Sequence, residues 1–278
     1  MEYFEYLKFI TIICSPVNNY LMLIPMNLHE KNQPYCGIDN LNAMVAAHNY
    51  NRFIIRQLLR EAGDSIAIVD FGAGAGLFSE AMKARGYFVT CVEPDPILRE
   101  SLVDRGFRCV SSIEELSECG YDFLFTINVL EHIRDDERAL QQILRVTKPG
   151  RRAYIYVPSF KVLFSSMDAR VGHFRRYRLS DLTQKLENAG FTEISGCYTD
   201  FIGAIMTLVF KLIGSRNGNV NITLLKIYDR LLFPANIIFD WIFHNLFGKN
   251  LIVSATRPTD LCLCRKSLVS GPTDSVTR

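Results

Sequence analysis

Three glycines, Gly72, Gly74 and Gly76, stand at alternate positions directly after the apolar run IVDF. Glycine lets a loop adopt positive φ and lets a ligand approach the backbone where a Cβ would otherwise stand. The free N–H groups of such a loop, together with the N-terminus of a following helix, favour an anionic or electron-rich ligand. Glu93, at the end of the next apolar run, can accept hydrogen bonds from both hydroxyls of a ribose. Together the loop and the acid predict a site for an adenosine-type cofactor.

The spacing of the glycines distinguishes between cofactors of this type. A dinucleotide site expects G-x-G-x-x-G, whereas this loop reads G-x-G-x-G and is followed by Leu77. Asp70 stands just before the loop, where a carboxylate would repel a pyrophosphate but attract an ammonium group. S-adenosylmethionine carries an ammonium, a carboxylate and a ribose, and it has no phosphate. The loop therefore favours S-adenosylmethionine over a nicotinamide dinucleotide.

Strand-like and helix-like segments alternate around these motifs. Short apolar runs predict strands at 66–71, 87–93, 107–110, 121–128, 152–158 and 191–200. Helices are predicted between them at 77–86, 97–106, 135–146 and 181–190, the last of which Ser180 can cap. This alternation requires parallel crossovers, so we expect an α/β fold with a doubly wound sheet. Ligands of such sheets bind outside the carboxyl ends of the strands, where the glycine loop lies.

At this point the sequence resembles the class I S-adenosylmethionine-dependent methyltransferases. The resemblance rests on VDFGAGAG, the acid in CVEPD, FTINVLEHI and ILRVTKPGRRAYIYVP, and it covers residues 49–200 and 250–257. It is strongest with the small-molecule subgroup of types 11 and 12, because NYN (49–51) and GHFRRY (172–177) are both present. The resemblance implies a Rossmann-like sheet of seven strands, with an antiparallel last strand between strand six and the sheet edge. It also implies S-adenosylmethionine as the cofactor and a small or lipid-linked acceptor.

The resemblance also places the cofactor contacts on this chain. It implies that the glycine loop holds the methionine end, that Asp70 lies near the amino group, and that Asn128 lies beneath the sulfonium. Ser112 matches the place where the fold contacts adenine, although it is equally suited to cap a helix. Tyr50 either covers the cofactor or packs in the core. The complete set is Tyr50, Asp70, Gly72, Ala73, Gly74, Gly76, Glu93, Pro94, Ser112, Ile113, Asn128, Val129 and His132.

The segment 165–182 gathers the titratable groups that we expect to face the acceptor. Histidine accepts a proton near neutral pH, so we expect His173 to deprotonate an acceptor hydroxyl while Asp168 orients its ring. Arginines bind carboxylates or phosphates at two points, and the acceptor is expected to contact Arg175, Arg176 and Tyr177. The alternative is a solvated basic turn that is held by an internal pair between Asp168 and an arginine. The expected reaction is O-methylation.

An apolar segment, residues 201–249, separates the sixth strand from the seventh. Pro234 suits the first turn of a helix, and Asn236, Asp240 and His244 recur every four residues as one polar stripe. No stretch reaches the roughly 20 apolar residues that a membrane span requires. Helices this apolar predict a lid over an apolar acceptor, a peripheral membrane contact or a homodimer interface, in that order of preference.

Composition narrows the functional classes. The net charge of +2 gives no case for nucleic-acid binding, and the eight cysteines lack the paired spacing of a zinc site, so no metal is expected. Unpaired cysteines in apolar runs suit a reducing compartment, which predicts the cytoplasm or the inner face of a membrane. The remaining alternatives are a nicotinamide-dependent oxidoreductase and a non-catalytic, methyltransferase-like binding module.

The expected domains follow from these segments. Residues 1–45 form an N-terminal extension that is neither a secretion signal nor a membrane span. The cofactor-binding core covers 46–200, the apolar insert 201–249 and the closing strand 250–264. Residues 265–278 lack an apolar pattern and are expected to be a disordered tail.

Overall fold

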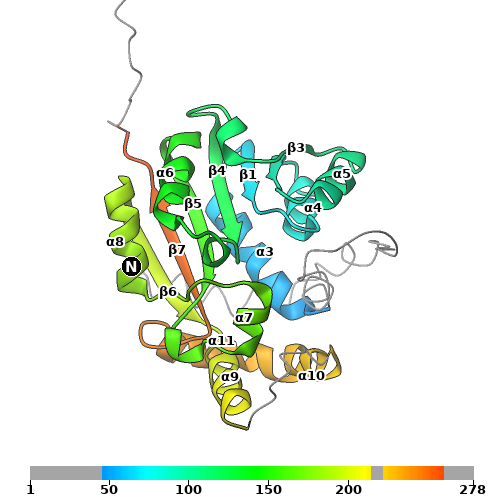
Figure 1. The fold of residues 1–278 in the computed structure, drawn as a ribbon, viewed down its shortest axis with the longest axis vertical. Coiled ribbons are helices and arrows are strands. Elements are labelled where there is room, and N and C mark those ends of the chain that lie inside the picture. The colour runs from blue at the N-terminus through cyan, green and yellow to red at the C-terminus, as the bar shows by residue number, and fades with distance from the viewer. Residues whose placement is uncertain (1–45, 214–221, 260–278) are drawn as a thin grey trace, which may run out of the picture. The chain divides into compact units, whose positions relative to one another are not determined.

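The computed structural model describes residues 46–213 and 222–259, so the predicted extension, the predicted tail and the end of the closing segment lie outside the described residues. Figure 1 labels the helices and strands. The helices are α3 (His48–Ala62), α4 (Leu77–Lys83), α5 (Pro96–Asp104), α6 (Asp136–Val146), α7 (Ser166–Val171), α8 (Leu179–Ala189), α9 (Phe201–Ile213), α10 (Ile222–Ile227) and α11 (Phe233–Phe243). The strands are β1 (Ala67–Phe71), β2 (Phe88–Val92), β3 (Arg108–Val110), β4 (Tyr121–Ile127), β5 (Thr147–Pro158), β6 (Thr192–Thr199) and β7 (Asn250–Thr256).

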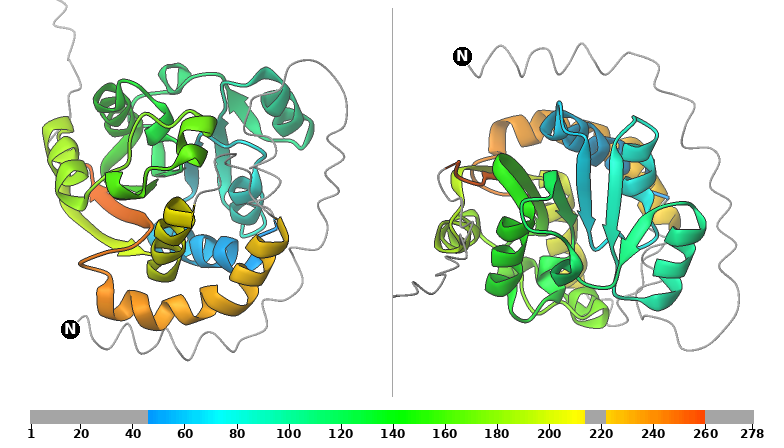
Figure 2. Two further views of the ribbon diagram at one scale, coloured as in Figure 1. Left: turned by 60° about the horizontal axis from the view of Figure 1, so that its bottom comes forward. Right: turned by 90° about the horizontal axis from the view of Figure 1, so that it is seen from above.

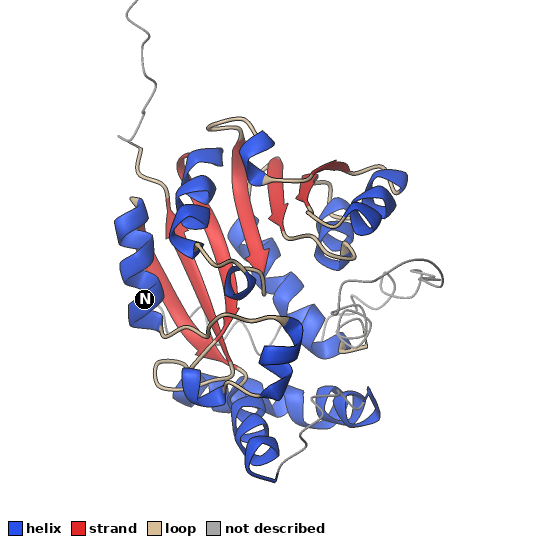
Figure 3. Ribbon diagram, viewed as in Figure 1, coloured by secondary structure: helices blue, strands red, loops and turns tan. Residues whose placement is uncertain are grey.

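The seven strands form one sheet in the order β3-β2-β1-β4-β5-β7-β6, drawn in red in Figure 3. β1 to β5 pair in parallel, and β7 is antiparallel to both of its neighbours. The predicted doubly wound sheet with an antiparallel last strand is confirmed. Strand order reverses between β1 and β4, which is where such folds bind their ligands.

The predicted place of the last strand is wrong, because β7 lies between β5 and β6 and leaves β6 at the edge. The burial of the two strands gives the reason. β7 is buried along almost its whole length, as an apolar strand in the interior of a sheet must be, whereas the first half of β6 is largely exposed.

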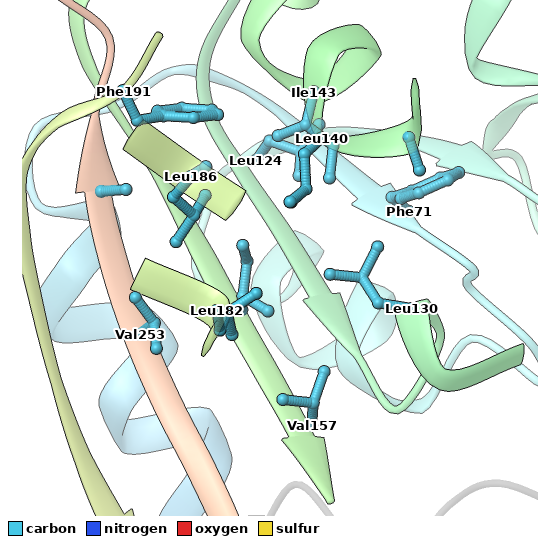
Figure 4. Packing of buried hydrophobic residues seen from close by; sticks show 14 of the residues in the cluster. Phe71, Leu124, Leu130, Leu140, Ile143, Val157, Leu182, Leu186, Phe191 and Val253 are labelled. Atoms are coloured by element: carbon cyan, nitrogen blue, oxygen red, sulfur yellow. The ribbon is translucent and has the colours of Figure 1, made fainter. Parts of the chain in front are cut away.

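Helices cover both faces of the sheet (Figure 2). On one face, side chains of α6 and α8 pack against the sheet, and Figure 4 shows Leu140, Ile143, Leu182 and Leu186 in this cluster. On the other face, α3, α4 and α5 pack against a second cluster, which includes Ile68 of β1. Successive residues of a strand point to opposite faces, so Asp70 shares the α4 face with Ile68.

Side chains accept hydrogen bonds from the free backbone N–H groups at the start of α6 and α8. The helix predicted at 135–146 begins one residue later, and Asp135 caps it, because its carboxylate accepts a hydrogen bond from the backbone N–H of Arg138. The predicted cap of α8 is wrong, since this helix begins at Leu179 and Ser180 lies inside it. The Tyr198 hydroxyl accepts the bond from the Leu179 N–H at 2.9 Å, so a neighbouring strand caps the helix.

The apolar insert forms α9, α10, a π-helical turn (Tyr228–Leu232) and α11, gathered near the carboxyl ends of the parallel strands (Figures 1 and 2). Pro234 lies in the first turn of α11, as predicted. The polar stripe turns inward: Asp240 accepts bonds from the N–H groups of Asp200 and Phe201, at the start of α9. Within the described residues, no helix is long and apolar enough to cross a membrane.

Candidate active site

A cavity of about 1650 Å³ opens where β1, β2, β4 and β5 end. Its wall includes the glycine loop, the residues after β2 and β4, the segment around α7, and the inner side of α9 and α10. Pockets for a single small molecule usually measure roughly 300–1,000 Å³. The cavity therefore has room for a cofactor and an acceptor together.

The glycine loop crosses the end of β2 with its backbone exposed to the cavity. The N–H groups of Gly72 and Ala73 donate to the carbonyl of Val92, and Gly72 and Gly74 have φ of 83° and 53°. A Cβ on Gly72 would overlap the Cγ2 atom of Val129, which lines the same cavity. Both the backbone conformation and the close approach to Val129 therefore require glycine at position 72.

Glu93 is held at the end of β2 by the loop itself. Its Oε2 accepts a bond from the Gly74 N–H at 2.7 Å, and its Oε1 accepts one from the Asp95 N–H at 3.0 Å. The side chain is buried, and burial raises the pKa of its carboxyl group. A carboxylate has about four acceptor positions, so two remain for the hydroxyls of a ribose. This arrangement fits an adenosine-type cofactor.

Two predicted cofactor residues do not line the cavity. Asp70 is buried under α4, where its Oδ2 accepts a bond from the Ser79 hydroxyl at 2.6 Å, and burial raises its pKa to about 7. Gly76 is the N-cap of α4, and its Cα packs against Leu102. Asp70 and Gly76 therefore join the loop to α4, and the contact between Asp70 and an ammonium group stays a prediction.

The other predicted cofactor residues all line the cavity. Ser112 does so while it caps the 3₁₀ turn Ile113–Glu115, so the predicted cap is present and the contact with adenine stays a prediction. Tyr50 likewise lines the cavity while its ring packs edge-on against Tyr156 and Phe233. The remaining wall residues of the set are Gly72, Ala73, Gly74, Glu93, Pro94, Ile113, Asn128, Val129 and His132.

His173 and Asp168, the predicted catalytic pair, are in contact on the cavity wall. His173 Nδ1 lies 2.7 Å from Asp168 Oδ1, and Arg176 donates to both oxygens of the same carboxylate at 2.8 and 3.0 Å. Burial opposes the charge of Asp168, but the bonds from His173 and Arg176 outweigh it and hold its pKa well below the usual range. An ionised carboxylate only accepts hydrogen bonds, so Nδ1 carries a proton, and in the neutral form of the ring the lone pair is on Nε2.

Of the three predicted substrate residues, the structure brings only Arg176 to the cavity wall, and its guanidinium is engaged by Asp168. Arg175 pairs with Asp136 at 2.7 Å, and the buried Tyr177 hydroxyl donates to the same carboxylate at 2.9 Å. This geometry places Arg175 and Tyr177 against the start of α6, and their contact with the acceptor stays a prediction.

Glu131, which was assigned no role from the sequence, stands beside His132 in a short turn after β4. The residue is fully buried, and neither carboxylate oxygen has a hydrogen-bond partner among the described residues. Glu131 Oε1 lies 3.8 Å from His173 Nε2, and burial raises its pKa to about 8. Burial, together with His173, lowers the pKa of His132 to about 4. The signal in the sequence was the Glu-His pair directly after a strand that ends at the cavity.

Comparisons with known proteins agree with this site. A family model described as a methyltransferase domain matches residues 46–195. The ubiquinone biosynthesis O-methyltransferase of Aeromonas salmonicida is 31% identical over 98 residues, which are 32% of this chain and 41% of that enzyme. The chain spans about half the length of the curated relatives it matches.

Solved structures share the fold. An S-adenosylmethionine-dependent methyltransferase from Thermotoga maritima has a TM-score of 0.57 at 16% identity, over 79% of this chain and 94% of that one. Phosphoethanolamine N-methyltransferase 2 of Haemonchus contortus, solved with phosphomonomethylethanolamine and S-adenosylhomocysteine, has a TM-score of 0.53 at 13% identity, over 81% and 59%. Because the family model covers more than half of the sequence and the fold agrees, the chain belongs to the class I S-adenosylmethionine-dependent methyltransferases.

Proposed function

We propose that the protein methylates a hydroxyl oxygen of a small or lipid-linked acceptor. The observation that supports this most directly is the ring of His173, oriented by Asp168 on the wall of the cavity that the glycine loop and Glu93 also line. S-adenosylmethionine supplies a methyl group on a positively charged sulfur, which is already a strong electrophile. The chain must therefore hold the two reactants in line and exclude water.

A hydroxyl acceptor also has to lose its proton, and His173 is placed to accept it. Its Nε2 carries the lone pair, and the bond from Nδ1 to Asp168 stabilises the ring once it becomes positively charged. Asp168 keeps its negative charge because Arg176 binds both of its oxygens. The proton passes from the acceptor oxygen to Nε2 and then to water.

The insert supports an acceptor with an apolar part. Met206 and Phe210 of α9 and Leu224 of α10 line the same cavity as His173. The Aeromonas relative is named for an O-methylation in ubiquinone biosynthesis, which adds support for an oxygen acceptor. We therefore propose that α9 and α10 form a lid over the apolar part.

The outer side of the insert supports delivery of that acceptor from a membrane. Ile238, Trp241, Ile242 and Leu246 are between 46% and 69% exposed on or just after α11. Lys226 and Arg230 are exposed nearby along the chain. We propose that this apolar face contacts a membrane surface peripherally, with a second copy of the chain as the alternative occupant.

The reaction is tested with purified protein, labelled S-adenosylmethionine and a panel of phenols and alcohols, with and without an alkyl or isoprenoid chain. We expect label on the acceptor oxygen and faster transfer to the chain-bearing members. His173→Ala should lower kcat while calorimetry shows unchanged affinity for S-adenosylhomocysteine. Retained turnover in this variant would contradict the role of His173. Failure to bind S-adenosylhomocysteine would contradict methyl transfer, and binding without transfer to any acceptor would favour a non-catalytic module.

A further inference from the structure

Three side chains outside the glycine loop form a compact group, which we call the Glu131 cluster: Glu131, His132 and His173. Each offers a nitrogen or oxygen atom, and these ligand atoms all lie within 4.8 Å of one another. The two imidazole rings meet edge to face, with their centroids 4.6 Å apart. Two of the three residues line the cavity, and the third lies directly behind them.

We propose that the Glu131 cluster binds one divalent first-row transition-metal cation. Two imidazoles and one carboxylate form a common ligand set for such cations. Three protein ligands leave further coordination positions open, which is the arrangement of a catalytic metal site rather than a structural one. Here the open positions would face the cavity, because His132 and His173 line it.

The surroundings of both histidines are those of metal ligands. A ligating imidazole usually donates its other ring N–H to a carboxylate or a backbone carbonyl, which fixes the orientation of the ring. His173 Nδ1 does so to Asp168 at 2.7 Å, which leaves Nε2 directed toward Glu131. The backbone of Val171 and Gly172 lies beside the His132 ring. The His173 ring therefore has Nδ1 engaged by Asp168 and Nε2 on the side of Glu131.

Glu131 supplies an independent observation. A buried carboxylate is unfavourable unless it is paired, coordinated or protonated. Neither oxygen of Glu131 accepts a hydrogen bond from another described residue. The groups that favour its charge are its own backbone N–H and Arg176, and Arg176 is already held by Asp168. A bound cation would provide the missing partner. The alternative is a protonated Glu131, and the test separates the two.

The cation would also change the proposed reaction. An acceptor hydroxyl could occupy an open coordination position, where the cation lowers its pKa and the proton leaves to water. The lone pair of His173 Nε2 would then bind the cation and would not accept the proton. This role rests on the proposed function, whereas binding of the cation does not.

Binding is tested on the full-length chain after treatment with a chelator, by titration with Co²⁺ under absorption spectroscopy and calorimetry. We expect one Co²⁺ per chain, with a spectrum typical of nitrogen and oxygen ligands. Because the chain has free cysteines, a thiolate band would reveal Co²⁺ bound to them, and we expect no such band. Glu131→Gln and His132→Gln should abolish this binding. The matched control is His48→Gln at the exposed start of α3, which should retain it.

Stability measurements and one more variant separate loss of Co²⁺ binding from poor folding. Glu131→Gln removes an unpaired carboxylate without changing its shape, so its melting temperature without metal should not fall. Asp168→Asn should weaken Co²⁺ affinity about 10- to 100-fold by loosening the His173 ring. Co²⁺ should raise the melting temperature of the wild type but not of Glu131→Gln.

Absence of saturable Co²⁺ binding, or equal binding by Glu131→Gln, would overturn the site and leave Glu131 protonated. Methyl transfer that is unchanged after chelation would overturn the role of the cation in the reaction. Normal Co²⁺ binding without transfer to any acceptor would support the site and contradict the proposed function.

Discussion

Gly72 shows how much of the site depends on a single missing side chain. An alanine here adds two separate costs, a left-handed backbone at φ 83° and an overlap with Val129. Gly86 has a φ of 90°, but a Cβ there meets nothing within 4 Å, so Gly86→Ala carries only the first cost. We expect Gly86→Ala to lower the free energy of unfolding by about 1 kcal/mol and Gly72→Ala by about 2–4 kcal/mol.

Urea unfolding measures both glycine variants, and calorimetry measures their affinity for S-adenosylhomocysteine. Only Gly72→Ala should lose affinity, because only its new methyl group pushes on a residue of the cavity wall. If both variants lost stability and affinity equally, the positive φ alone would explain why glycine is required at position 72. The close approach to Val129 would then contribute nothing.

Glu93 combines a structural and a binding role in one carboxylate. Its bonds to the N–H groups of Gly74 and Asp95 fix the loop, and its remaining acceptor positions suit a ribose. We expect Glu93→Gln to weaken S-adenosylhomocysteine binding about 10- to 100-fold, since hydrogen bonds to a charged acceptor are strong. Glu100→Gln, an exposed change on α5, is the control and should leave the affinity unchanged. Unchanged affinity in Glu93→Gln, measured by calorimetry, would remove Glu93 from the cofactor site.

At the residue scale, the sequence predicted roles that depend on local spacing and missed those that depend on distant partners. The glycine loop and Glu93 could be identified because strand ends place them together. Asp70 turned toward Ser79, and Arg175 toward Asp136, because buried partners were available that no local pattern shows. The Glu-His pair after β4 was a signal for Glu131, but its grouping with His173, which lies 42 residues further along the chain, could not be predicted from local spacing.

At the scale of elements, Asp122 joins three strands at the amino ends of the sheet. This β4 carboxylate accepts bonds from the N–H groups of Ile66 and Ala67, at the start of β1, and from Lys148 of β5 at 2.7 Å. Burial opposes its charge, but Lys148 and these N–H groups outweigh burial and lower its pKa to about 2. A depressed pKa stabilises the fold above the ordinary value of 3.8, and this contribution is lost as the pH falls toward 2.

We therefore expect Asp122→Asn to lower the free energy of unfolding by about 1–2 kcal/mol at neutral pH. The difference from the wild type should shrink as the pH falls below about 4, which urea unfolding at a series of pH values measures. Asp64→Asn is the control, because Asp64 also binds an arginine of β5, Arg151, but is 83% exposed and should contribute little. If the difference in free energy of unfolding between the wild type and Asp122→Asn grew as the pH fell, the lowered pKa of Asp122 would not be the source of the stabilisation.

The order of the strands could be predicted only in part from the sequence. Alternation of strands and helices predicts that β1 to β5 run parallel, because each helical crossover returns the chain to the same end of the sheet before the next strand begins. β6 and β7 are separated by the insert, so no short connection sets which of them pairs with β5. β7 takes the inner position because it is buried along almost its whole length. This burial can be seen only in the folded sheet, where the strands beside β7 are known.

At the scale of the whole molecule, the insert connects the cavity to the surface. α9 and α10 line the cavity, and α11 holds α9 in place through Asp240 and Asn236, whose side chains accept bonds from the first N–H groups of α9. The polar stripe predicted from the sequence is therefore an anchor between two helices.

Trp241 reports directly on the proposed membrane contact, because it is the only tryptophan in the chain and is 46% exposed. It lies on α11, three residues after Ile238, which is also four residues before Ile242, so Ile238 neighbours both exposed side chains on the helix surface. Vesicles that contain phosphatidylglycerol should shift its fluorescence to the blue and sediment with the protein, and salt should weaken both effects. Ile238→Ser with Ile242→Ser should reduce the binding.

The matched control is Phe88→Ser, which changes an equally exposed apolar residue at the start of β2, at the amino end of the sheet. It should bind vesicles like the wild type, since a single exposed apolar side chain is ordinary and only a contiguous apolar face drives partition. A blue shift that depends on protein concentration and appears without lipid would assign the α11 face to a second copy of the chain. That outcome would contradict membrane delivery of the acceptor while leaving the lid intact, because α9 and α10 line the cavity with different side chains from those that α11 exposes.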